Sequence, residues 1–215
     1  MMRYLAVSLA AVVLMPAIAA AKKFDGTSTI KTARHGDVAS RYLLREDGHL
    51  FREISGTPCE VTTDVSEFKI ADNPSDSAAV YLVKKGALYA LTTPTPDQVN
   101  NCPKAELTQL VPAIDAYAVV NRKDTPIALV ARDTTGKMTA WDAKGPAVWV
   151  EGTTEMRLNS CFGAKNKSFS SYVAFAIDGN GVVSKIGGKD PRHSKADRRR
   201  YRSLDAFFAK NKVCR

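Results

Sequence analysis

Residues 80–92 have the sequence VYLVKKGALYALT, which is an apolar run, a short polar turn with one glycine, and a second apolar run. Glycine suits such a turn because it readily adopts the positive φ that tight antiparallel hairpins require. The uninterrupted apolar run before the turn indicates a strand that is buried on both faces. The stretch therefore predicts a β-hairpin in the interior of the protein.

The same pattern occurs three more times along the chain. The further stretches are RYLLREDGHLFREI (41–54), IALVARDTTGKMTAWD (127–142) and YVAFAIDGNGVVSKI (172–186). The four turn glycines are Gly48, Gly86, Gly136 and Gly181. They lie 38, 50 and 45 residues apart. Strand-turn-strand units at a spacing of about 40–50 residues are typical of β-propeller blades.

The residues that follow each turn glycine also repeat. Two positions after the glycine the residue is apolar in all four stretches: Leu50, Leu88, Met138 and Val183. Five positions after it the residue is apolar in three stretches, as Leu91, Trp141 and Ile186, whereas the first stretch has Glu53. These shared positions indicate one structural unit used four times.

The segments between the hairpins supply further strands. They are CEVTTDVSEFKI (59–70), KAELTQLVPAI (104–114) and AVWVEGTTEMRL (147–158). The sequence thus predicts an all-β protein, a small β-propeller-like array of about four hairpin-based units with a C-terminal α-helix. A β-sandwich plus a helix is the alternative architecture.

Two of these stretches resemble a known repeat. GALYALT (86–92) and TGKMTAWDAKGPAVW (135–149) are similar to the quinoprotein-type blade repeats of periplasmic β-propeller proteins. The resemblance implies architecture only, because those families have eight blades and this chain has room for about four or five. The quinone cofactor of the family is not carried over to any residue here, and we expect no cofactor.

The first residues have the features of a secretory signal peptide. Arg3 precedes an uncharged apolar stretch over residues 5–15, and small residues at 17–21 offer a cleavage site. The apolar stretch is at or below the length of about 17–25 residues that spans a bilayer. We therefore expect a signal peptide over residues 1–21 and a bacterial mature protein that is soluble and either periplasmic or secreted.

The chain has four cysteines, Cys59, Cys102, Cys161 and Cys214. An even number in an exported protein predicts two disulfides. Of the three possible pairings we favour Cys59–Cys102 with Cys161–Cys214, because each pair encloses a compact stretch. No Cys-x-x-Cys or Cys/His spacing indicates a metal site, and we expect none.

The positive charge of the protein is concentrated near its C-terminus. Residues 189–215 contain ten Lys or Arg and three Asp, whereas residues 22–188 are almost neutral. Within this segment Ser194 and Asp197 have the spacing of a helix capping box, and Tyr201, Leu204 and Phe208 would share one helix face. We therefore divide the chain into the signal peptide, a β-repeat domain (22–188) and a basic helical segment packed on that domain (189–215).

The basic segment offers a candidate anion-binding site. Its arginines are Arg198, Arg199, Arg200 and Arg202. Clustered arginines suit phosphate-rich or otherwise anionic partners, although a solvated helix face carries the same composition. Nucleic acid is not expected as a partner, because no nucleic-acid-binding motif accompanies the cluster and the protein is expected to be exported.

The sequence contains no pattern that predicts catalysis. The three histidines, His35, His49 and His193, lack metal-ligand spacing. Asp47, Asp133 and Asp178 lie at hairpin turns, where aspartate is favoured for its bonds to the backbone. No catalytic residue is therefore named.

These features favour a non-enzymatic binding module of the cell envelope, which would bind a protein or a glycan through a rigid repeat scaffold. One alternative is an envelope hydrolase with acidic residues on the loop face. A second is a secreted factor that binds an anionic target through its basic segment.

Overall fold

The computed structural model describes residues 29–35, 38–54, 56–71, 80–92, 102, 105–121, 125, 127–142, 145–159, 169, 172–187 and 194–213. The expected signal peptide lies outside these residues. The described strands form four antiparallel sheets, and in each sheet four strands pair in chain order. We call these sheets units 1 to 4. The fold is therefore all-β and built of four repeated units, as predicted.

The strands of the four units have the following bounds. Unit 1 contains β1 (Thr29–His35), β2 (Val38–Leu44), β3 (Leu50–Ile54) and β4 (Thr57–Thr62). Unit 2 contains β5 (Val65–Ile70), β6 (Val80–Lys84), β7 (Ala87–Thr92) and β8 (Glu106–Val111). Unit 3 contains β9 (Ile114–Val119), β10 (Leu129–Asp133), β11 (Met138–Asp142) and β12 (Gly145–Val150). Unit 4 contains β13 (Thr153–Leu158), β14 (Tyr172–Asp178), β15 (Val182–Gly187) and β16 (Ser194–Arg200), and α2 (Leu204–Asn211) follows it.

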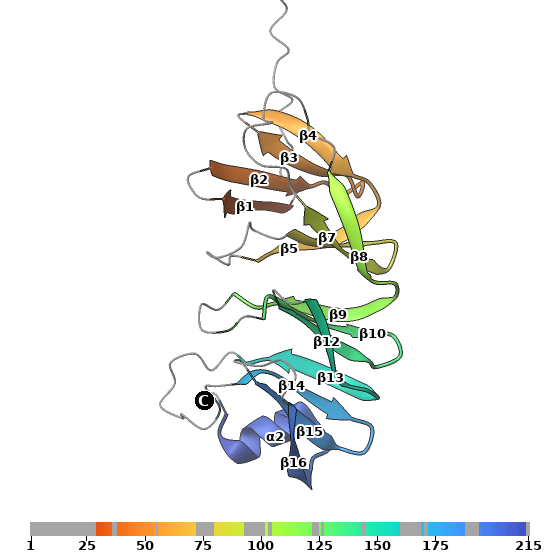
Figure 1. The fold of residues 1–215 in the computed structure, drawn as a ribbon, viewed down its shortest axis with the longest axis vertical. Coiled ribbons are helices and arrows are strands. Elements are labelled where there is room, and N and C mark those ends of the chain that lie inside the picture. The colour runs from red at the N-terminus through yellow and green to blue at the C-terminus, as the bar shows by residue number, and fades with distance from the viewer. Residues whose placement is uncertain are drawn as a thin grey trace, which may run out of the picture.

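The units follow one another along the long axis of the molecule (Figure 1). The first strand of unit 2, β5, lies against β1 and β2 of unit 1 and against β9 of unit 3. Unit 1 and α2 lie at opposite ends of this row. Over the described residues the array is therefore open.

The two middle strands of each unit are the hairpins predicted from the sequence. Their turn glycines all have φ between +75° and +82°. The carbonyl of each glycine accepts a hydrogen bond from the backbone N–H at the start of the next unit. The bonds run from Val65 to Gly48 (2.9 Å), Ile114 to Gly86 (2.8 Å), Thr153 to Gly136 (2.9 Å) and Tyr201 to Gly181 (2.8 Å). One turn thus joins each unit to the next.

The fourth of these bonds ends on a segment that is not a strand. Tyr201 occupies the position at which Val65, Ile114 and Thr153 begin a new unit. After Tyr201 the chain enters α2, whose N-cap Ser203 accepts a hydrogen bond from the Ala206 N–H (3.2 Å). The helix therefore takes the place that a fifth unit would occupy.

Apolar side chains fill each junction. Every unit contributes one buried pair of residues from its middle strands toward the next unit, and these pairs are Tyr42 and Leu50, Tyr81 and Leu88, Val130 and Met138, and Phe175 and Val183. The first three pairs pack against the following sheet, and the last packs against Leu204 and Phe207 of α2. Each Å² of apolar surface removed from water contributes about 25 cal/mol to stability. Burial at these junctions therefore stabilises the stacking of the units.

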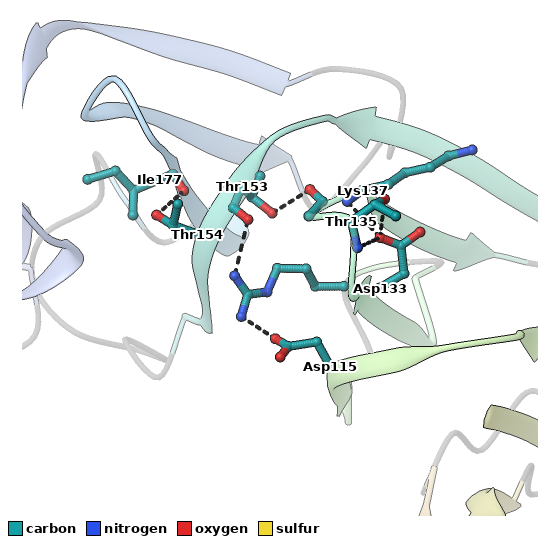
Figure 2. A network of polar contacts seen from close by, with 9 residues as sticks. Asp115, Asp133, Thr135, Lys137, Thr153, Thr154 and Ile177 are labelled. Carbon is teal, nitrogen blue, oxygen red and sulfur yellow. Dashed lines mark hydrogen bonds and ion pairs between the residues drawn. The ribbon is translucent and has the colours of Figure 1, made fainter. Parts of the chain in front are cut away.

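Polar side chains cross the same junctions. Figure 2 shows the network between units 3 and 4, in which Arg132 donates to the Thr153 carbonyl (3.1 Å) and forms an ion pair with Asp115. The Thr153 hydroxyl also donates to the carbonyl of Gly136 (2.8 Å). The position of unit 4 on unit 3 is thus fixed by directional bonds as well as by packing.

The disulfide between Cys59 and Cys102 is present, as predicted. Cys59 is buried on β4, whereas Cys102 is exposed and precedes β8. The bond therefore ties the outer strand of unit 1 to the segment that leads into the outer strand of unit 2. The predicted partners Cys161 and Cys214 lie outside the described residues.

The prediction of a helix from Ser194 is wrong. Residues 194–200 form β16, and the helix begins ten residues later at Leu204. Without β16 the free edge of β15 would leave its backbone groups unpaired, and that cost outweighs a local capping pattern. Of the predicted apolar face, Tyr201 and Leu204 are buried and Phe208 is half-buried, and the neighbouring Phe207 is fully buried, so the segment still packs on unit 4.

Candidate anion-binding surface

The four arginines of the basic segment all lie on the surface of unit 4. Arg198, Arg199 and Arg200 end β16, and Arg202 lies in the turn to α2. All four are exposed. We call these four residues the arginine cluster, and its position on a strand rather than on a helix is the main change from the sequence prediction.

The carboxylates nearest in sequence are paired with other cations. Asp197 forms an ion pair with Lys185 (2.9 Å), and Asp205 forms one with Arg157 (2.6 Å). Within the described part of the chain, no ion pair involves a guanidinium of the arginine cluster. The cluster therefore has unneutralised positive charge available to a partner.

The strand that carries the cluster is irregular. Val182 pairs with Arg200 and Ser184 pairs with Ala196, so Val183 alone stands opposite three residues of β16. The outer strands of units 1 to 3 have a bulge at the corresponding place, but each contains only one extra residue: Val61, Leu110 and Trp149. The bulge of β16 is larger by one residue, and Arg198 and Arg199 lie within it.

The Asp197 carboxylate holds this bulge. One of its oxygens accepts a hydrogen bond from the Arg199 backbone N–H (3.0 Å), and the other pairs with Lys185. Only 15% of the Lys185 side chain and 16% of the Asp197 side chain are exposed. Burial by itself raises the pKa of Asp197, but the bonds from Lys185 and the Arg199 N–H outweigh it and lower the pKa below its ordinary value. Asp197 is therefore a fixed anion, stabilised chiefly by Lys185 and to a smaller extent by the charge of Arg199.

The Lys185 ammonium lies above the aromatic core of unit 4. It is 5.7 Å from the ring centre of Phe169 and 6.0 Å from that of Phe207. Cations near aromatic faces are stabilised by the ring quadrupole. The support of the arginine cluster is thus connected to the packing of α2.

The start of α2 is anchored on β13. The Leu204 N–H donates to a Glu155 carboxylate oxygen (3.3 Å), and Arg157 bridges Glu155 and Asp205. A carboxylate is favoured at a helix N-terminus because the unpaired N–H groups there carry partial positive charge. The helix is therefore held in place by polar contacts as well as by its apolar face.

The turn aspartates have structural roles. One oxygen of Asp133 accepts hydrogen bonds from Thr135 N–H (2.9 Å), the Thr135 hydroxyl (2.6 Å) and Lys137 N–H (2.9 Å) (Figure 2). Burial raises the pKa of Asp133, but these bonds outweigh it and lower the pKa overall. Asp178 likewise accepts from the N–H groups of Asn180 and Val182. Both carboxylates thus stabilise the turns in which they lie.

Sequence reasoning missed the two residues that support the cluster. In the sequence Asp197 matches a helix cap, whereas in the structure it supports a strand bulge together with Lys185. One signal for this contact is that Lys185 is the charged residue of the mainly apolar strand VVSKI, and a buried charge requires a partner.

The described residues contain no group of three His, Cys, Asp or Glu side chains arranged to hold a metal ion. They also contain no helix that is long and apolar enough to cross a membrane.

Comparison with known proteins adds no assignment. No protein-family model matches the chain, and no curated protein is significantly similar to it. The resemblance to quinoprotein-type blade repeats therefore stays a prediction, and the function has to be inferred from the structure.

Proposed function

We propose that this protein is an exported, non-enzymatic binding module of the cell envelope, and that the arginine cluster is its contact with an anionic partner. The proposal rests chiefly on the four exposed arginines, which have no ion-pair partner among the described residues although carboxylates lie close by. A cluster of unpaired positive charges raises the local concentration of anions and accelerates their association with the protein.

The repeat scaffold suits this role. Each unit is fixed to the next by a buried apolar junction and by the hydrogen bond that the carbonyl of its turn glycine accepts, so β16 is carried by a rigid support. A rigid support reduces the conformational entropy that binding must overcome. The expected signal peptide and the disulfide between Cys59 and Cys102 are compatible with an exported, oxidising location.

The test measures binding of the mature, oxidised protein to two anionic probes, dextran sulfate beads and phosphatidylglycerol vesicles, over a range of salt concentrations. We expect binding to at least one probe that weakens as salt rises. Replacing Arg198, Arg199 and Arg200 with Ala should abolish it.

The matched control removes the same charge elsewhere. Arg45, Lys85 and Lys137 are exposed cations of the hairpin turns in units 1 to 3, and their triple replacement with Ala should leave most of the binding intact. If neither probe is bound, or if both triple variants lose binding equally, the arginine cluster is not the contact.

A further inference from the structure

We infer that the arginine cluster is a preformed site for a linear polymer of phosphate or sulfate groups, and that Lys185 and Asp197 are positioning residues for its arginines. This inference rests on the proposed function and adds the chemistry of the partner and the device that orients the site. Four observations support it.

The first observation is the residue type. Residues 198–202 contain four arginines and no lysine. Lysine would protect an edge strand from pairing or keep the surface soluble equally well. The guanidinium group differs because it offers a planar fork of donors that binds two oxygens of one anion at once. A cluster made only of arginine therefore favours oxyanions over general solubility.

The second observation is the enlarged bulge of β16. A β-bulge bends its strand and changes the direction of the side chains within it. The bulges of β4, β8 and β12 contain one extra residue, whereas that of β16 contains two and includes Arg198 and Arg199. The unit that carries the arginines is thus the one whose outer strand departs most from the repeat.

The third observation is that the bulge is fixed by a largely buried ion pair. Asp197 bonds the Arg199 backbone on one side and Lys185 of β15 on the other. Breaking a buried pair on one side leaves an uncompensated charge, so this arrangement resists distortion. The backbone under the arginines is therefore ordered before any partner arrives.

The fourth observation concerns the shape of the partner. Three of the four arginines, Arg198, Arg199 and Arg200, are consecutive residues of β16, so their charges follow the strand over about 10 Å at about 3.3 Å per residue. A helix that binds a lipid surface presents apolar side chains to it, but Tyr201, Leu204 and Phe207 are buried in the protein. A chain of anions fits this arrangement better than a membrane does.

The test uses a substitution that adds positive charge. Asp197→Ala raises the net charge of the protein by one, so an unstructured basic patch would bind polyphosphate more tightly. If Asp197 positions the arginines, the variant binds more weakly, by about fivefold, because the site is no longer preformed.

Two further variants make the comparison specific. Asp205→Ala adds the same charge in the same segment but removes an exposed partner of Arg157, and we expect its affinity to equal or exceed that of the wild type. Asp197→Asn keeps an acceptor for the Arg199 N–H and should retain more affinity than Asp197→Ala. Thermal unfolding of each variant identifies any loss of fold, and Asp197→Asn keeps the test valid if Asp197→Ala does not fold.

A charge-conserving triple variant tests the residue type. Replacing Arg198, Arg199 and Arg200 with Lys keeps the charge but removes the guanidinium forks, and we expect weaker binding of polyphosphate, of dextran sulfate or of both. The two polymers show whether phosphate or sulfate is preferred.

Two results would overturn the inference. If Asp197→Ala and Asp205→Ala both bind the polymers more tightly than the wild type, the site is not preformed. If phosphatidylglycerol vesicles bind and neither polymer does, the partner is not a linear polyanion. In both cases the arginine cluster remains an anion-binding surface, so the proposed function would stand.

Discussion

The two ends of the array are capped in different ways. In each middle hairpin, one cross-strand pair faces the preceding unit, and in units 2 to 4 this pair is apolar: Val80 with Leu91, Leu129 with Trp141, and Ala174 with Ile186. In unit 1 the same pair is Arg41 with Glu53, which form an ion pair at 3.0 Å. At the other end, the opposite face of unit 4, which carries Phe175 and Val183, is apolar and is covered by α2.

The comparison shows two ways of ending a row of stacked units. On the outer face of unit 1 the ion pair of Arg41 with Glu53 lies beside Leu43, which is buried, and Phe51, which is half-buried, so this face is less apolar than the equivalent face of the other units. Unit 4 keeps the apolar face of an interior unit, and a helix covers that face. Repeat proteins need such caps because an exposed interior face is insoluble. The exception Glu53, which interrupted the sequence pattern, is therefore part of the cap at unit 1.

The helical cap should be the more costly one to disrupt. Phe207 of α2 is fully buried against unit 4, and its ring centre lies 5.5 Å from that of Phe175. Phe207→Ala should destabilise the protein by about 3–5 kcal/mol, because it leaves a cavity in this junction. Urea unfolding measures the loss, and hydrogen exchange should show that protection of α2 falls before that of β2. Lys210→Ala, on the exposed side of the helix, should change stability by less than about 0.5 kcal/mol.

The next largest effect concerns the disulfide that joins units 1 and 2. Replacing Cys59 and Cys102 with Ala should cost about 2–4 kcal/mol, because the closed loop no longer restricts the unfolded chain. The loss should appear in units 1 and 2 and leave α2 protected from exchange. Peptide mapping of the oxidised protein without reduction checks the pairing, and a Cys59–Cys161 peptide would contradict it.

A single methyl group should weaken the link between unit 4 and its cap. A Cβ at Gly181 would lie 2.4 Å from the Tyr201 carbonyl oxygen, and the glycine has φ of +79°. Gly181→Ala should therefore cost about 1–3 kcal/mol. Gly179 in the same turn has open space around it and no positive φ, so Gly179→Ala should be nearly neutral. Equal thermal stability of the two variants would show that the turn is not the link described.

Replacing the ion pair of Arg41 with Glu53 by an apolar pair should alter self-association more than the free energy of unfolding. Arg41→Val combined with Glu53→Leu reproduces the pair found in unit 2, and the exposed ion pair that it removes contributes only about 0–1 kcal/mol. The variant should self-associate through its new apolar face, as measured by analytical ultracentrifugation. A variant that stays monomeric at all concentrations would show that this face is not the cap.

The smallest expected effect is pH-dependent and concerns Asp197. Its pKa is lower in the folded protein than its ordinary value of 3.8, so protonation favours the unfolded state. The stability that Asp197 contributes is complete above the ordinary pKa and is lost as pH falls through the folded pKa. Between about pH 5 and pH 3 the Asp197→Asn variant should lose less stability than the wild type, as measured by thermal unfolding. Identical losses would contradict the role of this carboxylate.

The sequence predicted those parts of the fold that local chemistry determines. The four hairpins follow from apolar runs around glycines that need positive φ, and the pairing of Cys59 with Cys102 follows from the compact stretch between them. The boundary between β16 and α2 could not be predicted in this way. Ser194 and Asp197 match a helix cap as well as Ser203 does, and the choice depends on the free edge of β15.

The sequence predicts which residues make up the candidate site, but it does not predict the contacts that support them. The concentration of arginine near residue 200 is visible in the sequence, and its exposure follows from charge. Its support depends on a contact between Lys185 and Asp197, which lie on neighbouring strands and become adjacent only when β15 and β16 pair. No periodicity in the chain indicates that contact.

The position of the helical cap also affects how the molecule is made. Residues 204–213 follow unit 4 in the chain, so Phe175 and Val183 have no cover until the last residues have been synthesised. Until α2 docks, this face is open to aggregation and to proteases.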